Sequence, residues 1–143
     1  MSGKSAGYKN DLLRLFFNAT ASNANIPLAR SATATSFWLT LCTGIPGTAS
    51  SDMLVNEATY TGYQRVEVIR TSGFTVAGNA ASLAANVTFA TASSSGQVIT
   101  HFGVGSTSTG TGYLFYAGTC TPTITIDMGV IPILTTGTQV TED

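Results

Sequence analysis

The stretch HFGVGSTSTGTGYLFYAG, residues 101–118, joins two runs of strand-forming residues through a connection of glycine, serine and threonine. The first run covers Gln97–Gly105, and the second begins at Tyr113. The connection, Ser106–Gly112, has seven residues, which is longer than the roughly two to five residues of a tight hairpin. We therefore predict two strands that pair as a hairpin, with a flexible, exposed and adaptable loop between them.

The same stretch has the glycine spacing of a phosphate-binding loop. Gly105 and Gly110 match the two glycines of GxxxxGK[ST], but Thr111 and Gly112 stand where that motif has its lysine and its hydroxyl residue. No cation would reach the terminal phosphates, and we predict no helix after the loop to bind them at its N-terminus. We therefore expect no nucleotide and no other cofactor.

His101 is the one histidine of the chain, so any nucleophilic triad would depend on it alone. A structural zinc site needs about four Cys or His ligands, and the chain has three such residues in total. We predict no catalytic and no metal-binding residue, and a structural His101 that is partly buried and hydrogen-bonded. Glycoside hydrolysis requires two carboxylates close together, and nothing in the spacing of the carboxylates in this sequence indicates such a pair. An unrecognised hydrolase is therefore only the third hypothesis, after the two given at the end of this section.

Cys42 and Cys120 lie in strand-like surroundings, TLCTG and AGTCTP. Small buried or half-buried thiols are the favoured interpretation, and a disulfide is the alternative. A reducing compartment argues against the disulfide.

The N-terminal part of the chain predicts a helix. In Tyr8–Phe17, YKNDLLRLFF, the apolar residues recur at helical spacing and form one stripe, which includes Leu12 and Phe16. That stripe must be buried on the body of the protein or on a neighbour. The small polar residues before it, 1–7, are typical of a flexible arm.

From Phe37 onward the hydrophobic period changes to two, which predicts short strands separated by Gly, Ser and Pro. The second strand of the hairpin is predicted at Tyr113–Ala117. In addition to the hairpin, the expected strands are Phe37–Thr43, Tyr63–Arg70, Leu83–Ala90, Pro122–Asp127 and Thr138–Thr141. Residues 48–62 lack this period and are predicted to form a loop. The pattern indicates an all-β fold, an antiparallel sandwich or barrel with one short N-terminal helix. The 143 residues fit a single domain over residues 8–143.

Charge is scarce in this sequence, at 9% of residues against about 25% in typical domains. A surface so poor in charge is weakly protected against association, so we expect a homo-oligomer. The six basic residues are scattered, which argues against nucleic-acid binding. No apolar run approaches the roughly 20 residues of a membrane span, and no secretory signal is apparent at the start. We therefore expect no membrane partner, and synthesis in a cytoplasm.

We expect the remaining conspicuous residues to contact other subunits or surfaces. The aromatic residues could form a sugar-stacking platform or an interface patch, because tyrosine supplies a large contact area with a polar tip. For any single one of them, a place in the core or in a cross-strand pair is the favoured interpretation. These residues are Tyr60, Tyr63, Tyr113, Phe115 and Tyr116. The predicted interaction residues are Leu12, Phe16, Tyr60, Tyr63, Arg65, Ser106 and Thr109.

Several stretches, in this order, resemble a known family. They are NDLLRLFF, FWLTLCTG, NEATYTGYQRVEV, VTFATASSSGQVITHFGVG and YLFYAGTCTPTITIDMGVIPILTTGTQVTED. Together they are similar to small virion proteins of tailed bacteriophages, in the head decoration (cement) and tail-fibre-like family. The most specific pieces are the block from Glu57 to Arg65, THFG at 100–103, and LFYAG with the Pro-bearing segment that follows.

This resemblance implies a β-sandwich without enzymatic activity that is repeated on the virion. We therefore expect an antiparallel β-sandwich of jelly-roll type with one short N-terminal helix. The leading hypothesis is a capsid decoration protein on the outer surface of the head, made in the host bacterial cytoplasm. It would bind the major capsid protein as a symmetric oligomer, with a trimer favoured, and stabilise the shell by adding buried area. The alternative is a tail or fibre module that contributes to host-receptor attachment.

Overall fold

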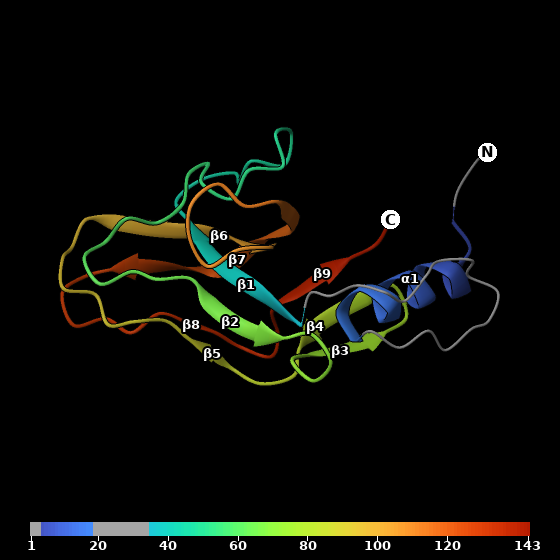
Figure 1. Cartoon of the computed structure of the whole chain (residues 1–143). Coiled ribbons are helices and arrows are strands. Elements are labelled where there is room, and N and C mark those ends of the chain that lie inside the picture. The colour runs from blue at the N-terminus through green and yellow to red at the C-terminus, as the bar shows by residue number, and fades with distance from the viewer. Residues whose placement is uncertain (1–3, 19–34) are drawn as a thin grey trace. The chain divides into compact units, whose positions relative to one another are not determined.

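The computed structural model describes residues 4–18 and 35–143 (Figure 1). One helix near the N-terminus is followed by strands in three sheets, with orders β2-β1-β6-β7, β3-β4-β9 and β5-β8. The pairings β1–β6, β6–β7, β3–β4, β4–β9 and β5–β8 are all antiparallel. These elements confirm the predicted all-β antiparallel fold with one N-terminal helix, and the described strands form no closed barrel.

The helix, α1, covers Ala6–Asn18. The strands are β1 (Ser36–Cys42), β2 (Val66–Ile69), β3 (Phe74–Ala77), β4 (Ala80–Leu83), β5 (Val87–Thr88), β6 (Gln97–Gly105), β7 (Leu114–Ile126), β8 (Ile133–Leu134) and β9 (Gln139–Thr141).

The described chain forms two compact units. The first contains residues 69–86 and 135–143 with the described residues up to 35, and the second contains residues 36–68 and 87–134. A single domain over residues 8–143 stays a prediction.

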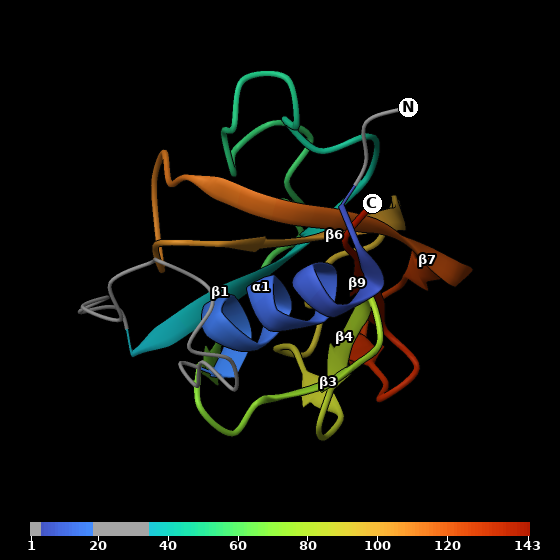
Figure 2. The same ribbon diagram turned by 90° about the vertical axis from the view of Figure 1, so that its right-hand side faces the viewer.

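In the first unit, α1 lies against β3 and β4 (Figure 2). Leu13 and Phe17 are fully buried, and the ring of Phe17 lies 4.5 Å from that of Phe74 on β3. Val76, Leu83 and Val140 complete this small apolar core. The helix therefore buries the stripe predicted from its spacing, at least in part, within its own chain.

Arg70 fixes the C-terminal end of α1. Its Nε donates to the carbonyl oxygen of Phe16 and its Nη2 to that of Leu15, each at 2.6 Å. The last carbonyls of a helix have no partner within the helix, and a cation there also opposes the negative end of the helix dipole. Burial lowers the pKa of the Arg70 guanidinium.

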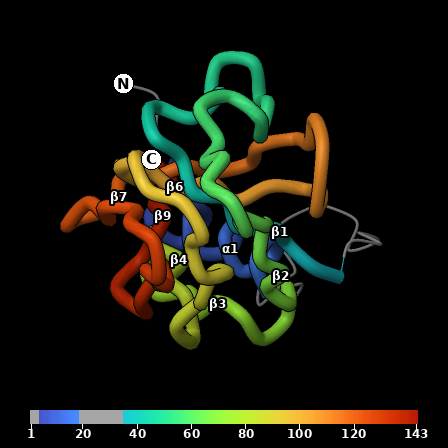
Figure 3. The backbone as a smooth tube through the Cα atoms, turned by 90° about the vertical axis from the view of Figure 1, so that its left-hand side faces the viewer, coloured from blue at the N-terminus to red at the C-terminus, as the bar shows by residue number. Residues whose placement is uncertain are grey.

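In the second unit, β6 is an inner strand of the largest sheet, with β1 on one side and β7 on the other. His101 pairs with Cys42 on β1 and with Thr119 on β7. The β6–β7 pairing confirms the hairpin predicted from the 101–118 stretch. The segment after β1 leaves the sheet as a long loop, drawn in teal to green at the top of Figure 3.

Several predicted boundaries were wrong. The helix begins at Ala6, inside the predicted arm, and Lys4 just before it forms an ion pair with Glu142; residues 1–3 lie outside the described residues. The predicted strand Leu83–Ala90 is two strands, because β4 ends at Leu83 and β5 begins at Val87.

The second strand of the hairpin is also longer than predicted. β7 continues from Leu114 to Ile126 and includes the stretch predicted as a separate strand from Pro122, because a register shift opposite Ile99–His101 absorbs the extra residues of β7. β3 was not predicted at all. Its two buried residues, Phe74 and Val76, alternate with exposed Thr75 and Ala77, but the strand has only four residues and gives a weak signal.

Candidate functional site

The candidate site is the 106–112 loop, at the end of the β6–β7 hairpin. The loop is closed at its base by Ser106, whose N–H donates to Tyr113 O at 3.0 Å and whose Oγ accepts from Tyr113 N at 2.8 Å. Within it, Thr107 Oγ1 donates to Thr109 O at 3.1 Å. The loop therefore has a defined shape from its own bonds.

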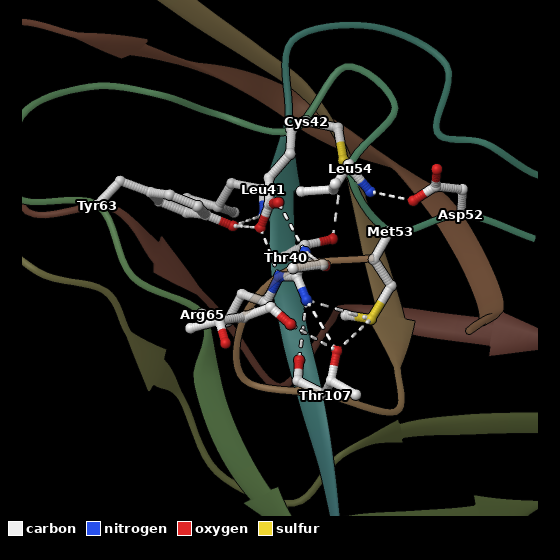
Figure 4. A network of polar contacts seen from close by, with 12 residues as sticks. Thr40, Leu41, Cys42, Asp52, Met53, Leu54, Tyr63, Arg65 and Thr107 are labelled. Atoms are coloured by element: carbon white, nitrogen blue, oxygen red, sulfur yellow. Dashed lines mark hydrogen bonds and ion pairs between the residues drawn. The ribbon is translucent and has the colours of Figure 1, made fainter. Parts of the chain in front are cut away.

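Arg65 holds the loop through side-chain hydrogen bonds, of which those to Thr107 are drawn in Figure 4. Its Nη1 donates to Thr107 O at 3.0 Å and to Thr107 Oγ1 at 3.2 Å, and its Nη2 donates to Gly110 O at 2.8 Å. A charged donor forms stronger hydrogen bonds than a neutral one, and a guanidinium presents several donors in a fixed plane. These contacts correct the expectation of a flexible and adaptable loop.

Glu57 balances the charge of Arg65. Nε of Arg65 lies 2.7 Å from Glu57 Oε1, and Nη2 lies 2.8 Å from Oε2, so the two side chains form a bidentate ion pair. The Arg65 side chain is 2% exposed and that of Glu57 is 10% exposed. Hydrogen bonding to Glu57 raises the pKa of Arg65, which therefore stays charged despite its burial.

Tyr63 joins the pair to the central sheet. Its hydroxyl donates to Glu57 Oε1 at 2.9 Å and accepts from the N–H of Leu41 on β1 at 3.2 Å. Burial, followed by the negative charge of Glu57, raises the pKa of the Tyr63 hydroxyl. The ion pair is thus anchored on a largely buried strand, and Figure 4 shows the Tyr63 hydroxyl beside Leu41.

The segment 43–58, which we call the β1-side loop, packs against the same hairpin end. Met53 N donates to Gly112 O at 3.1 Å, and Leu114 N donates to Ser51 O at 2.8 Å. A Cβ atom at Gly105 would overlap the thioether of Met53, so the close approach of the two segments requires glycine there. The two loops therefore form one connected structure.

Four of the seven predicted interaction residues meet at this loop. Ser106 and Thr109 are exposed on it, Arg65 is buried below it, and Tyr63 is half-buried beside Glu57. Tyr60 is 4% exposed, and its hydroxyl donates to Ala90 O at 3.0 Å.

The other two predicted residues belong to the first unit. Leu12 and Phe16 are half-buried on α1. Their contact with another subunit stays a prediction.

His101 and the two cysteines were the other candidates for a reactive or metal-binding side chain, and all three are buried or half-buried. His101 is half-buried, and its Nδ1 lies 2.8 Å from Thr100 Oγ1, which confirms the predicted partial burial and hydrogen bond. Both cysteines are free thiols, as favoured from the sequence. Burial raises the pKa of Cys42 and of Cys120 to about 11, so both stay protonated at neutral pH.

The pairing of Glu57 with Arg65 was missed from the sequence. The signal was present, because these two charges lie eight positions apart in a block with few others, NEATYTGYQR. Nothing in that spacing showed that the arginine side chain would be buried and would bond to the 106–112 loop, more than forty residues further along the chain.

No helix in residues 4–18 and 35–143 is long and apolar enough to span a membrane.

Comparisons with known proteins identify the family. A search of curated proteins finds no match. A family model described as "Podophage GP4 fiber I protein gp80" matches residues 3–141. The matched family is one of fibre proteins, so the expectation of a capsid decoration protein on the head, with the major capsid protein as its partner, was wrong. The alternative, a tail or fibre module, agrees with the match. Because the match covers nearly the whole chain, this protein belongs to the bacteriophage family of podophage GP4 fiber I protein gp80.

Proposed function

We propose that this protein is a non-enzymatic structural component of a phage fibre, present as a homo-oligomer, and that it contributes to attachment of the virion to its host. The observation that carries the proposal is the fibre-family match over residues 3–141. The scarcity of charge, at 9% of residues, supports an assembly of several copies, since it weakens repulsion between them.

The 106–112 loop is the surface that we assign to host contact. Ser106 and Thr109 are exposed there, and the loop offers hydroxyl groups without charge. Because Arg65 already fixes the loop, a receptor would not have to order it, which lowers the entropic cost of binding. Arg65 and Glu57 serve this contact indirectly, as positioning residues.

Immunogold labelling of intact virions with antibodies against this chain tests the assignment to the fibre. Label on the fibres at the tail is the expected result. Label spread over the head shell would contradict the proposal.

Adsorption of variant phage tests the attachment role. Thr109→Asp places a charge on the exposed loop and leaves every hydrogen bond of Arg65 in place, since the Thr109 contact within the loop uses its backbone oxygen. This variant should adsorb to host cells more slowly than wild type. Thr125→Asp, at an exposed threonine on β7 of the same unit, is the matched control and should adsorb normally. Equal adsorption of both variants and wild type would contradict the attachment role.

A further inference from the structure

Beside the 106–112 loop, the β1-side loop exposes apolar side chains that no contact described above uses. Ile45 is 69% exposed, Leu54 46%, Val55 38% and Tyr113, at the end of the hairpin loop, 59%. We call these four residues the apolar patch. Exposed apolar residues are ordinary when scattered singly, but a group on one structured surface marks an interaction site.

Side-chain and backbone contacts place the members of the apolar patch on one surface. Asn56 Nδ2 donates to Ile45 O at 2.8 Å, which joins the two ends of the β1-side loop. A Cβ atom at Gly47 would lie 2.8 Å from Val55 Cγ2, so Val55 packs across the same turn. Asp52 forms isolated β-bridges both to Gly47 and to Tyr113.

The backbone beneath the patch is fixed. Thr43 N donates to Asn56 O at 2.9 Å, and Ala58 N donates to Leu41 O at 2.8 Å. Ser51 and Asn56 have φ angles of 54° and 56°, in the left-handed region that a serine rarely adopts. Such backbone is retained where the surrounding contacts determine it, and it is concentrated at binding sites. The patch is therefore presented in one shape before any partner arrives.

The chemistry of the patch selects an apolar, neutral partner. In the β1-side loop before Glu57, the one ionisable residue is Asp52. Its Oδ1 already accepts a hydrogen bond from Leu54 N at 2.8 Å. Three of the four side chains are aliphatic and offer neither hydrogen bonds nor stacking faces to a glycan, but they are buried readily against another protein. The fourth, Tyr113, packs its ring against that of Phe115, with the centroids 5.4 Å apart. A highly charged partner would find no opposite charge on the patch to pair with.

We propose that the apolar patch is the docking surface for a second copy of this chain, so that the patches of neighbouring copies meet at their symmetry axis. Two neutral apolar patches are complementary to each other, and the formal net charge of −1 leaves little repulsion between copies. The inference rests on the proposed function, in which the fibre contains several copies. Docking at this patch would gather the adjacent 106–112 loops of those copies, and several weak receptor contacts would then act together.

Sedimentation velocity of the full chain over a range of concentrations tests the docking surface. Wild type should form oligomers, and Leu54→Asp and Ile45→Asp should each raise the dissociation constant by about tenfold or more, because a charge would be buried without a partner. Met128→Asp is the matched control, at a residue of the same unit that is 75% exposed, and should behave as wild type.

The far-UV circular dichroism of each variant must match that of wild type, and Leu54→Ser and Ile45→Ser replace any aspartate variant that does not fold. Three results would overturn the inference: a monomeric wild type at every concentration, patch variants that keep the wild-type oligomer, or a control that dissociates as they do. Immunogold label on the fibre together with any of these results would leave the proposed fibre location standing and reject the docking surface alone. Label on the head would reject the fibre location whatever the sedimentation shows.

Discussion

The guanidinium group of Arg65 donates to both carboxylate oxygens of Glu57, at 2.7 and 2.8 Å, while its remaining N–H groups hold two carbonyl oxygens of the 106–112 loop. One buried ion pair thus supports an exposed loop that carries no charge of its own. The arrangement explains how a chain with so few charged residues can present a long polar loop in a single shape.

Removing one partner of this ion pair should destabilise the protein strongly. Arg65→Met leaves the Glu57 carboxylate partly buried without its cation, and Glu57→Gln leaves the guanidinium without its anion. We expect either change to lower the free energy of unfolding by about 3–5 kcal/mol. Urea denaturation measures the loss.

The double variant Glu57→Leu/Arg65→Met should lose less than the sum of the single changes, because it leaves no unpaired charge. Asp127→Asn, at an exposed carboxylate of the same unit, is the control and should change stability by less than about 0.5 kcal/mol. Single variants as stable as this control would show that the pair does not support the loop.

Gly105→Ala should disturb the contact between the hairpin end and the β1-side loop. The new methyl group would overlap the thioether of Met53, and forcing extra volume into a packed site costs about 1–3 kcal/mol. Gly137→Ala is the control, because a Cβ atom there would meet only Thr135 Oγ1, at an ordinary 3.5 Å. Thermal unfolding should show a lower midpoint for Gly105→Ala than for Gly137→Ala, and equal midpoints would refute the packing argument.

Arg70→Lys should weaken the first unit although it keeps the positive charge. A lysine has one nitrogen at its tip and cannot reproduce the geometry in which Nε and Nη2 of Arg70 each bond a carbonyl of α1. Loss of one charge-assisted hydrogen bond is expected to cost about 1.5–3 kcal/mol. Hydrogen exchange of the α1 amides should be faster in this variant, and unchanged exchange would mean that the cap does not hold the helix.

Much of the fold could be predicted from the sequence because its signals are local. The strand-forming residues of Gln97–Gly105 and the turn residues after them define the β6–β7 hairpin without reference to the rest of the chain. The helix followed in the same way from apolar spacing. β3 was missed because a four-residue strand gives too short an alternation to stand out.

The candidate site depends on contacts distant in sequence, which explains why less of it was predicted. Ser106 and Thr109 were chosen because the loop is hydroxyl-rich, a local property. The fixed shape of that loop comes from Arg65, which is 42 positions before Thr107 and 45 before Gly110. Composition suggested flexibility, and buried hydrogen bonds overrode it.

Stability should fall as the pH rises from about 9 toward 11. The pKa of Cys42 and of Cys120 is about 11 in the folded protein, above the ordinary value of 9.0, because burial disfavours the thiolate. A group whose pKa is higher in the folded state stabilises it fully below the unfolded pKa, and that stabilisation is lost as the pH rises through the folded pKa. The Tyr63 hydroxyl, whose pKa is also raised, acts in the same direction at higher pH.

Urea denaturation at pH 8, 9, 10 and 11 measures this loss. The variant Cys42→Ala/Cys120→Ala should show a shallower fall across the same range, whatever its stability at pH 8. A fall as steep as that of wild type would mean that the thiols are not the groups responsible.

A reconstruction of the intact virion by electron cryo-microscopy tests most directly the claim that this chain is a fibre component. We expect the folds of both units, each fitted separately, to account for density in the fibres of the tail, in several copies related by symmetry. Density for these folds on the outer surface of the head shell, with none in the fibres, would contradict that claim.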